Sequence, residues 1–497
     1  MYLIDQYRGT IFSCRYEIPP RLAPIESRTE LETSVKVAVA ETIMRHPMMQ
    51  VAIVDANSKT PSWIQLEILD LTQHIKWLYI EEHDDFEQKV QETIRTQLDD
   101  HFPNFSVKQP GWKITILRQG NAPSMEVLLT WNHAHFDGAG ARVFHEDLLE
   151  MLNNPEKGAC ERAGLESDIL KLPPTPPLLP EPIESLQSLP VDFKYLAKAF
   201  WEESRPQFLN RDVSNAVWCP IRSSPYKTQF RAFFLNNASL LAILARCRQN
   251  KTTITGLLNG LLLIAFSSHL DSTAAPAFQS STMVDHRRNL PPAPADAPWN
   301  RSDRAVCNYV TQCLHKFDTE QVARVRSKLP ADAGEGRDLS ADLERELWAV
   351  SAQNRLEIVN KLEAGLRNDM VGLFKYVTDW QKTMRDMAKK TRQFSWIVTN
   401  VGVMNGDTSI TSRTATTQSP TSNDNKSDDS QKWSISRAEF GLSAEIPAAA
   451  IEFASVSVTS GGMCISANWA DCAVDERFGE SIMADLERWL KQLGRQS

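Results

Sequence analysis

Runs of β-favouring hydrophobic residues alternate with helical patterns over the first third of the chain. Residues 112–117 and 124–131 are short, apolar and rich in strand-forming residues. Residues 31–45 and 81–100 favour helices, and the first of these ranges begins with acidic and ends with basic residues, as the helix dipole prefers. This succession predicts an α/β lobe, which we place at residues 1–170.

A proline-rich segment then interrupts the pattern. Six of the residues 172–182 are proline. Such a segment favours neither a helix nor a central strand, but a stiff and extended connector. We therefore assign residues 171–191 to a connector between two lobes, and residues 192–497 to the second lobe.

The second lobe is predicted to contain further strands, a buried apolar helix and an amphipathic terminal helix. The predicted helices span residues 256–270 and 475–493, and the predicted strands span residues 394–402, 433–440, 451–458 and 463–469. Residues 407–432 carry no large apolar side chain after Ile410. Because such a segment cannot bury a core, we expect a disordered insertion there.

Composition and charge narrow the class of protein. Hydrophobic residues make up 42% of the 497 residues and charged residues 23%, which are values typical of globular proteins. A net charge of −8 without a basic cluster gives no footprint for nucleic acid. The longest apolar stretch, residues 254–266, is broken by Gly256, Asn259 and Gly260 and is too short to span a bilayer.

The cysteines and the first residues indicate the cellular compartment. The eight cysteines show no regular spacing, which is typical of reduced thiols in a cytosolic protein. Asp5 stands where a secretion signal would continue its apolar core. We expect a cytoplasmic protein that binds neither nucleic acid nor a membrane.

The candidate chemistry lies just after the strand at residues 124–131. His133 follows this strand, Asp137 comes four residues later, and Gly138 and Gly140 precede a helical pattern. An imidazole titrates near neutral pH, so a neutral His133 could take a proton from an attacking alcohol or amine. The Asp137 carboxylate could point at the imidazole, or it could turn to an arginine and brace the loop.

Two other interpretations of this segment compete with the first. His133 and His135 form a His-x-His pair that could bind zinc, but Asp137 completes only part of a ligand set. His135 could instead be the working base, because alternation on an extended segment places both histidines on one face. Periodicity does not choose between them.

The run His133-Ala134-His135-Phe136-Asp137-Gly138 resembles the HxxxDG signature of an acyltransferase superfamily. This superfamily contains condensation domains of peptide synthetases, plant-type acyltransferases and fungal alcohol acetyltransferases. Asn132 stands where condensation domains carry a second histidine, and residues 439–441 keep only part of the plant-type Asp-Phe-Gly-Trp-Gly run. The chain is therefore most similar to the standalone fungal O-acyltransferases of the alcohol or trichothecene acetyltransferase type.

The resemblance implies a fold of the α/β (α+β) class. Two chloramphenicol-acetyltransferase-like lobes, each a mixed sheet with flanking helices, would enclose a tunnel between them. His133 would act there as the general base, while Asp137 would be structural and Gly138 would form the tight turn. The segment Val284-Asp285-His286-Arg287 is similar to the superfamily's V-D-x-R segment, which makes Arg287, or Arg288 with a shift of one, the expected partner of Asp137.

The same resemblance suggests the substrates. The run Thr399-Asn400-Val401-Gly402 resembles the S-N-x-G of fungal alcohol acetyltransferases, so Thr399 and Asn400 would bind substrate or form a turn. The expected co-substrate is acyl-CoA, with acetyl-CoA preferred, and the expected acceptor is the hydroxyl of a small specialised metabolite. We expect a monomer without a metal or a bound cofactor. The alternatives are an enzyme that uses a carrier-bound donor or forms an amide, and a non-catalytic binding protein.

Overall fold

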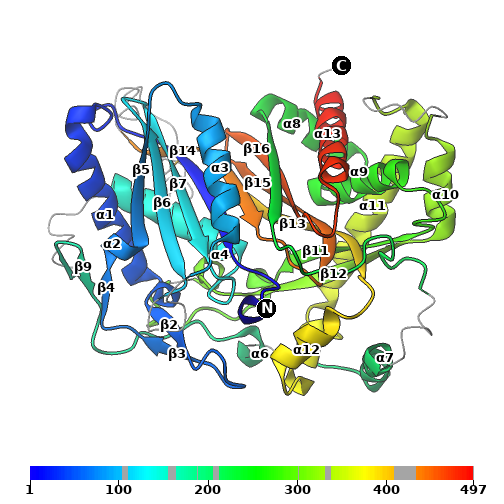
Figure 1. The fold of residues 1–497 in the computed structure, drawn as a ribbon, viewed down its shortest axis with the longest axis horizontal. Helices are drawn as coiled ribbons and strands as arrows, with labels where there is room; N and C mark the ends of the chain where they lie inside the picture. The colour runs from blue at the N-terminus through cyan, green and yellow to red at the C-terminus, as the bar shows by residue number, and fades with distance from the viewer. Residues whose placement is uncertain are drawn as a thin grey trace, which may run out of the picture.

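Two mixed β-sheets with flanking helices form two lobes that lie side by side in the computed structural model (Figure 1). The structure describes residues 1–102, 110–154, 164–186, 189–204, 212–299, 301–330, 337–407 and 432–495. Of the insertion predicted at residues 407–432, all but the two end residues lies outside the described part. The two-lobed α/β architecture is the one that the sequence predicted.

The sheet of the first lobe has the strand order β14–β1–β7–β6–β5. Its strands are β1 (Thr10–Glu17), β5 (Ile75–Ile80), β6 (Trp112–Gln119), β7 (Ser124–Trp131) and β14 (Ser434–Leu442). Helices α1 (Arg28–Arg45) and α4 (Gly138–Asn153) pack on one face of this sheet, and α3 (Phe86–Asp99) packs on the other. Because β7 is central and covered on both faces, it is apolar along most of its length rather than alternating.

Strand β14 belongs to the sheet of the first lobe, although its residues lie in the range 192–497 assigned to the second. It pairs antiparallel with β1, with Thr10 opposite Leu442. Phe440 brings an aromatic ring into the first core, where its centroid lies 6.1 Å from that of Phe12 and 6.4 Å from that of Trp131. The C-terminal part of the chain therefore contributes a strand to the first sheet, and the two lobes share a core rather than meeting only at a linker.

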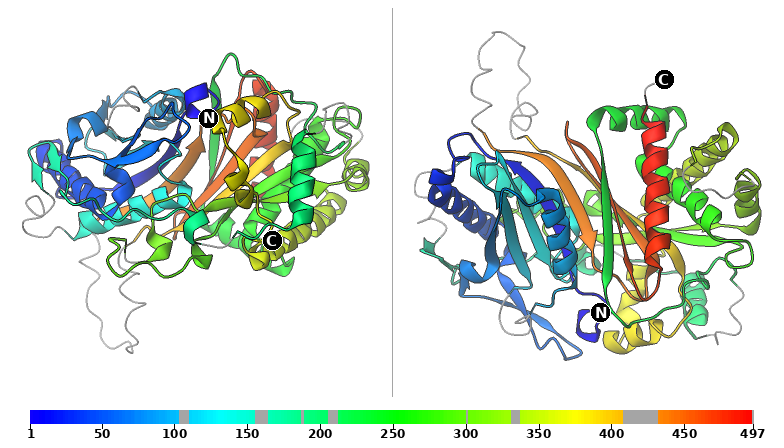
Figure 2. Two further views of the ribbon diagram at one scale, coloured as in Figure 1. Left: turned by 90° about the horizontal axis from the view of Figure 1, so that it is seen from below. Right: turned by 45° about the horizontal axis from the view of Figure 1, so that its top comes forward.

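The sheet of the second lobe has the strand order β10–β16–β15–β13–β11–β12. Its strands are β10 (Thr228–Leu235), β11 (Phe278–Asp285), β12 (Val310–Phe317), β13 (Phe394–Met404), β15 (Ala449–Val458) and β16 (Gly462–Ala470). Its helices are α8 (Asn237–Gln249), α9 (Ile254–His269), α10 (Thr319–Ser327), α11 (Ala341–Ala364) and α13 (Glu476–Leu493). Figure 2 shows these helices gathered on the side of the sheet that faces away from the first lobe.

The apolar helix α9 lies at the centre of this second layer. Its residues from Gly256 to Ser267 are all buried. A Cβ atom on Gly260 would lie 2.9 Å from the side chain of Leu347 in α11, so the small residue allows the two helices to approach closely. This close packing explains why the helix is apolar on every side.

The smaller elements connect the two lobes or cover their ends. They are β2 (Val51–Val54), β3 (Ser62–Gln65), β4 (Ile68–Asp70), β8 (Leu165–Glu166), β9 (Ile169–Lys171), α2 (Leu71–His74), α6 (Ile183–Leu186), α7 (Phe193–Ser204) and α12 (Trp380–Met387). The connector at residues 171–191 is not extended throughout, because α6 forms after its last clustered proline. Pro182 immediately precedes this short helix and its carbonyl accepts the first turn's hydrogen bonds, a position where proline is tolerated.

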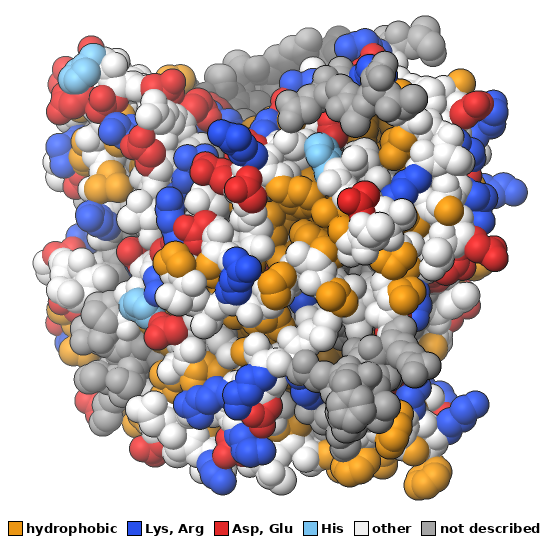
Figure 3. All heavy atoms as spheres, turned by 45° about the vertical axis from the view of Figure 1, so that its right-hand side comes forward, with side chains coloured by type: hydrophobic (Ala, Val, Ile, Leu, Met, Phe, Trp, Pro, Cys, Tyr) orange, Lys and Arg blue, Asp and Glu red, His pale blue; other side chains and the backbone are white. Residues whose placement is uncertain are grey.

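The surface mixes charges of both signs. On the face drawn in Figure 3, Lys, Arg, Asp and Glu side chains are interspersed, and hydrophobic side chains gather near the middle of the face. In the part of the chain that the structure describes, no helix combines the length and the apolar character needed to cross a lipid bilayer.

Candidate functional site

The candidate site is the loop that joins β7 to α4. Asp137 is the N-cap of α4, and its Oδ1 accepts a hydrogen bond from the Gly140 N–H at 2.8 Å. A Cβ on Gly138 would lie 3.0 Å from the ring of Phe440 in β14. The glycine therefore lets the helix start against a strand that comes from the far end of the chain.

Asp137 makes a bidentate ion pair with Arg287, the partner that the sequence suggested. The Arg287 Nη2 donates to Oδ1 at 2.8 Å and Nη1 donates to Oδ2 at 2.9 Å, while the Tyr309 N–H donates to Oδ2 at 2.9 Å. With Gly140, each carboxylate oxygen accepts two hydrogen bonds. Both side chains are buried. Burial alone would raise the pKa of Asp137, but the Arg287 charge and these hydrogen bonds hold that pKa below its ordinary value.

Arg287 also ties the loop that precedes β12 to the site. Its guanidinium donates to the carbonyl of Ala305 at 3.1 Å and to that of Cys307 at 2.7 Å. Next to Cys307, the Asn308 Nδ2 donates to the backbone carbonyl of His133 at 2.8 Å. Residues of the second lobe therefore fix both ends of the His133–Asp137 turn.

His133 and His135 point into different surroundings. The His133 ring is only partly buried, and its centroid lies 6.1 Å from that of Tyr7. The His135 ring is fully buried: its Nδ1 lies 3.1 Å from the Met48 carbonyl, and its Nε2 accepts from the Gly111 N–H at 3.1 Å. Burial lowers the pKa of His135 to about 4, although the bond to Met48 opposes this shift.

The turn at His46 and Pro47 supports the motif from behind. The His46 Nε2 lies 2.7 Å from Oδ2 of Asp147 in α4, and Arg304 of the second lobe also pairs with Asp147. The carbonyl of Met48, two residues after His46, is the one that His135 contacts. His46 is thus a turn residue that joins the end of α1 to α4.

The candidate substrate-binding residues Thr399 and Asn400 lie on β13, at a bulge next to Gly402. The Asn400 Oδ1 accepts from the Gly402 N–H at 2.9 Å and its Nδ2 donates to the Thr255 hydroxyl at 3.0 Å. Asn400 therefore makes a local turn contact and binds the start of α9. Thr399 is partly buried, and neither of these two hydrogen bonds involves it. β13 reaches the motif through Val401, whose side chain lies 3.4 Å from the Cβ position of Gly138.

Sequence reasoning assigned no role to Asn308, Arg304 or Met48. The run Cys307-Asn308-Tyr309 has a recognisable pattern, yet nothing local indicates that Asn308 reaches back to a loop 175 residues earlier. Across the described residues, His, Cys, Asp and Glu side chains form no group of three that could hold a metal ion. Because His133 and His135 have separate environments, they do not form a pair of ligands.

The chain is similar to known acetyltransferases. A family model for alcohol acetyltransferases matches residues 64–301, a range that contains His133, Asp137 and Arg287. The probable alcohol acetyltransferase FCK4 of Fusarium pseudograminearum is 25% identical over 472 residues, which cover 93% of this chain and 86% of that protein.

Solved structures share the fold. The trichothecene 15-O-acetyltransferase TRI3 from Fusarium sporotrichioides aligns with a TM-score of 0.64 at 14% identity, covering 99% of this chain and 92% of that one. The condensation domain of the Monacolin K polyketide synthase MokA aligns with a TM-score of 0.51 at 8% identity, covering 98% and 91%. The family match and the similarity along nearly the whole chain support an acyltransferase that is similar to the alcohol acetyltransferases.

Proposed function

We propose that the protein is a CoA-dependent O-acyltransferase that moves an acyl group, with acetyl preferred, from acyl-CoA to the hydroxyl of a small specialised metabolite. His133 is the general base. The observation that carries this proposal is the contrast within the motif. Asp137 is fully engaged by Arg287 and backbone N–H groups, whereas the His133 ring is left partly exposed beside it.

His133 suits the role of base better than His135. Both ring nitrogens of His135 have backbone partners, so an incoming hydroxyl would have to displace one of them. A group whose pKa is about 4 is also a weak proton acceptor at neutral pH. Asn308 binds the backbone carbonyl of His133. This contact positions the residue without engaging its ring nitrogens.

The proposed reaction proceeds by direct transfer. A ring nitrogen of neutral His133 takes the proton of the acceptor hydroxyl as its oxygen attacks the thioester carbonyl carbon. The tetrahedral oxyanion then collapses, the carbon–sulfur bond breaks, and the imidazolium returns the proton to the CoA thiolate. Thr399 is a candidate donor to the oxyanion, because it lies on β13, the strand that contacts the motif through Val401.

The names of similar proteins support our proposal for the acceptor. The similar protein FCK4 is named as a probable alcohol acetyltransferase, and one similar solved structure is a trichothecene acetyltransferase. A hydroxylated specialised metabolite made by a fungus is therefore our first candidate. We further propose that the enzyme acts as a cytoplasmic monomer, without a metal.

Replacing His133 by Ala should lower kcat for transfer from acetyl-CoA by about 100-fold or more, because the attacking hydroxyl loses its base. The measurement is the release of free CoA with a panel of alcohols, alongside a thermal unfolding curve that should match the wild type. His83→Ala, at a largely exposed histidine, is the matched control and should keep wild-type turnover. Retention of more than about a tenth of the wild-type rate by His133→Ala would refute the assignment.

Replacing Arg287 by Ala should lower the free energy of unfolding by about 3–5 kcal/mol, because it leaves the Asp137 carboxylate buried without its cation. The double change of Asp137→Leu with Arg287→Met removes both charges and should cost less than Arg287→Ala alone. Urea unfolding measures all three proteins. Arg28→Ala, which breaks an exposed pair with Glu32, should have little effect. Equal losses from Arg28→Ala and Arg287→Ala would contradict the bracing role.

The pH dependence of stability tests the state of His135. Since its pKa is lowered in the folded protein, acid favours the unfolded chain, which binds the proton first. The stability advantage of wild type over His135→Gln should therefore be full above about pH 6.5 and shrink by about 1.4 kcal/mol per pH unit down to about pH 4. His145→Gln, at a buried histidine outside the motif with a pKa of about 3, should show the same trend. An advantage that stays constant from pH 7 to pH 5 would show that His135 is not buried as a neutral ring.

A further inference from the structure

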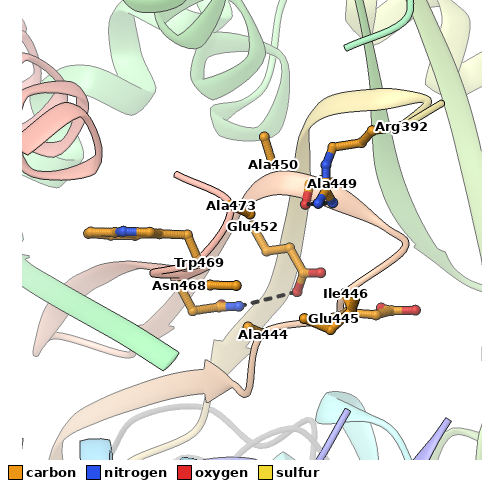
Figure 4. Close-up of a pocket in the computed structure, with 11 residues that line it drawn as sticks. Arg392, Ala444, Glu445, Ile446, Ala449, Ala450, Glu452, Asn468, Trp469 and Ala473 are labelled. Carbon is orange, nitrogen blue, oxygen red and sulfur yellow. Dashed lines mark hydrogen bonds between the residues drawn. The ribbon is translucent and has the colours of Figure 1, made fainter. Parts of the chain in front are cut away.

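A small polar pocket lies where β15 begins and β16 ends, outside the motif loop. Its polar lining consists of Arg392, Glu445, Glu452 and Asn468, and most of the remaining lining residues are alanines (Figure 4). The open space has room for about one water-sized group. The proposed reaction uses none of these four side chains.

Glu452 is the unusual member of this pocket. Its side chain is 6% exposed, and its Oε2 accepts from the Asn468 Nδ2 at a long 3.4 Å. Among the described residues, no group hydrogen-bonds to its buried Oε1. Burial, and to a smaller extent Glu445, raise the pKa of Glu452 well above its ordinary value, which favours the protonated, neutral form of this carboxyl group. A neutral carboxyl group both donates and accepts hydrogen bonds.

The surroundings of Glu452 balance charges of both signs. Figure 4 shows its carboxyl group between Glu445 and the guanidinium of Arg392. The Arg392 guanidinium is itself held by the carbonyls of Cys219 at 3.0 Å and Ala449 at 2.7 Å. A cation would be repelled by Arg392. A small uncharged group with both a donor and an acceptor, such as a hydroxyl, is not repelled and can hydrogen-bond to the carboxyl group of Glu452.

Glu452 lies on the face of the second sheet that is turned to the first lobe. Side chains alternate along a strand, and Ala454 and Val456, which share the face of Glu452, pack in the core of the first lobe. In the register between β13 and β15, Thr399 pairs with Ala454 and Ile397 with Glu452. Glu452 therefore lies on the same face as Thr399. Along β15 it is two residues, or about 7 Å, before Ala454, the residue that pairs with Thr399.

The pocket is also close to His133 through the first residues of the chain. The pocket residue Ile446 donates its N–H to the carbonyl of Gln6 at 3.0 Å. Tyr7, the next residue, has its ring centroid 6.1 Å from that of His133. Residues Gln6 and Tyr7 therefore lead from the edge of the pocket to the side of the His133 ring.

We propose that Glu452 and Asn468 form a subsite for a second hydroxyl group of the acceptor, so that the enzyme selects diols and polyols over simple alcohols. The reacting hydroxyl lies at His133 while the second hydroxyl fills the pocket and satisfies Oε1 of Glu452. A buried polar atom left unpaired is costly, so an acceptor without this hydroxyl binds less well. This inference rests on the proposed transferase function and specifies its substrate class.

The test uses straight-chain diols of four to ten carbons, with hydroxyl groups at both ends, and the matched mono-alcohols. With acetyl-CoA and wild-type enzyme, the ratio of kcat/KM for diol over mono-alcohol should reach about tenfold or more within a narrow range of chain lengths. That range measures the spacing between His133 and the pocket. In Glu452→Leu the ratio should fall to about two, the statistical value for an acceptor with two equivalent hydroxyls. Glu452→Gln keeps a donor and an acceptor and should retain most of the preference.

Glu439 supplies the matched control. It is another buried glutamate, with a pKa that burial raises to about 7, but it lies on β14 with Gln91 as its partner and does not line the pocket. Glu439→Leu should leave the diol ratio unchanged. A preference that survives Glu452→Leu, or one lost equally in Glu439→Leu, would overturn the subsite.

Binding separates the failure of this inference from failure of the proposed function. His133→Ala keeps the pocket, so calorimetry with the same series should show the preference for the diol without turnover. A diol preference in binding without CoA release by wild type would support the subsite and contradict the transferase. If wild type favours no diol in transfer and His133→Ala favours none in binding, the subsite is overturned.

Discussion

The buried ion pair between Asp137 and Arg287 is the interaction on which the rest of the site depends. It joins the start of α4 in the first lobe to the residues that follow β11 in the second. Removing two charges from water costs several kcal/mol per ion, and only good geometry with further hydrogen bonds offsets that cost. Here both carboxylate oxygens and the guanidinium have such partners, including the carbonyls of Ala305 and Cys307. The pair is therefore specific to one relative position of the two lobes.

Because the ion pair fixes Asp137, the residues of the β7–α4 loop have different surroundings. Asp137 faces the second lobe and holds the turn, and His135 is buried between Met48 and Gly111. The His133 ring stays partly exposed, and we propose that it is the base. Because β14 also crosses into the first sheet, Phe440 packs behind Gly138. The loop is thus supported by residues from both ends of the chain, which suits a group that must be aimed at a reactant.

The sequence predicted the elements around the site because their signals are local. The apolar run of β7, the glycines after Asp137 and the helical pattern that follows are all contained within residues 124–153. Arg287 was found only through resemblance, since no local pattern links two residues that are 150 positions apart. The placement of β14 in the first sheet has no local signature either, because strand partners are chosen by the whole fold. Spacing also left His133 and His135 equivalent. The register of the motif favoured His133, and in the structure burial separates the two rings. Glu452 is the one charged residue of β15, and no local pattern indicates that this acid faces a pocket.

The central claim is that His133 is the group that receives the proton of the acceptor. A crystal structure of the enzyme with an acetyl-CoA analogue whose thioester sulfur is replaced by methylene, together with an accepted alcohol, tests it most directly. We predict that the acceptor oxygen lies about 2.6–3.2 Å from a ring nitrogen of His133 and faces the carbonyl carbon of the analogue. An acceptor oxygen held by another titratable side chain, out of reach of the His133 ring, would contradict the account.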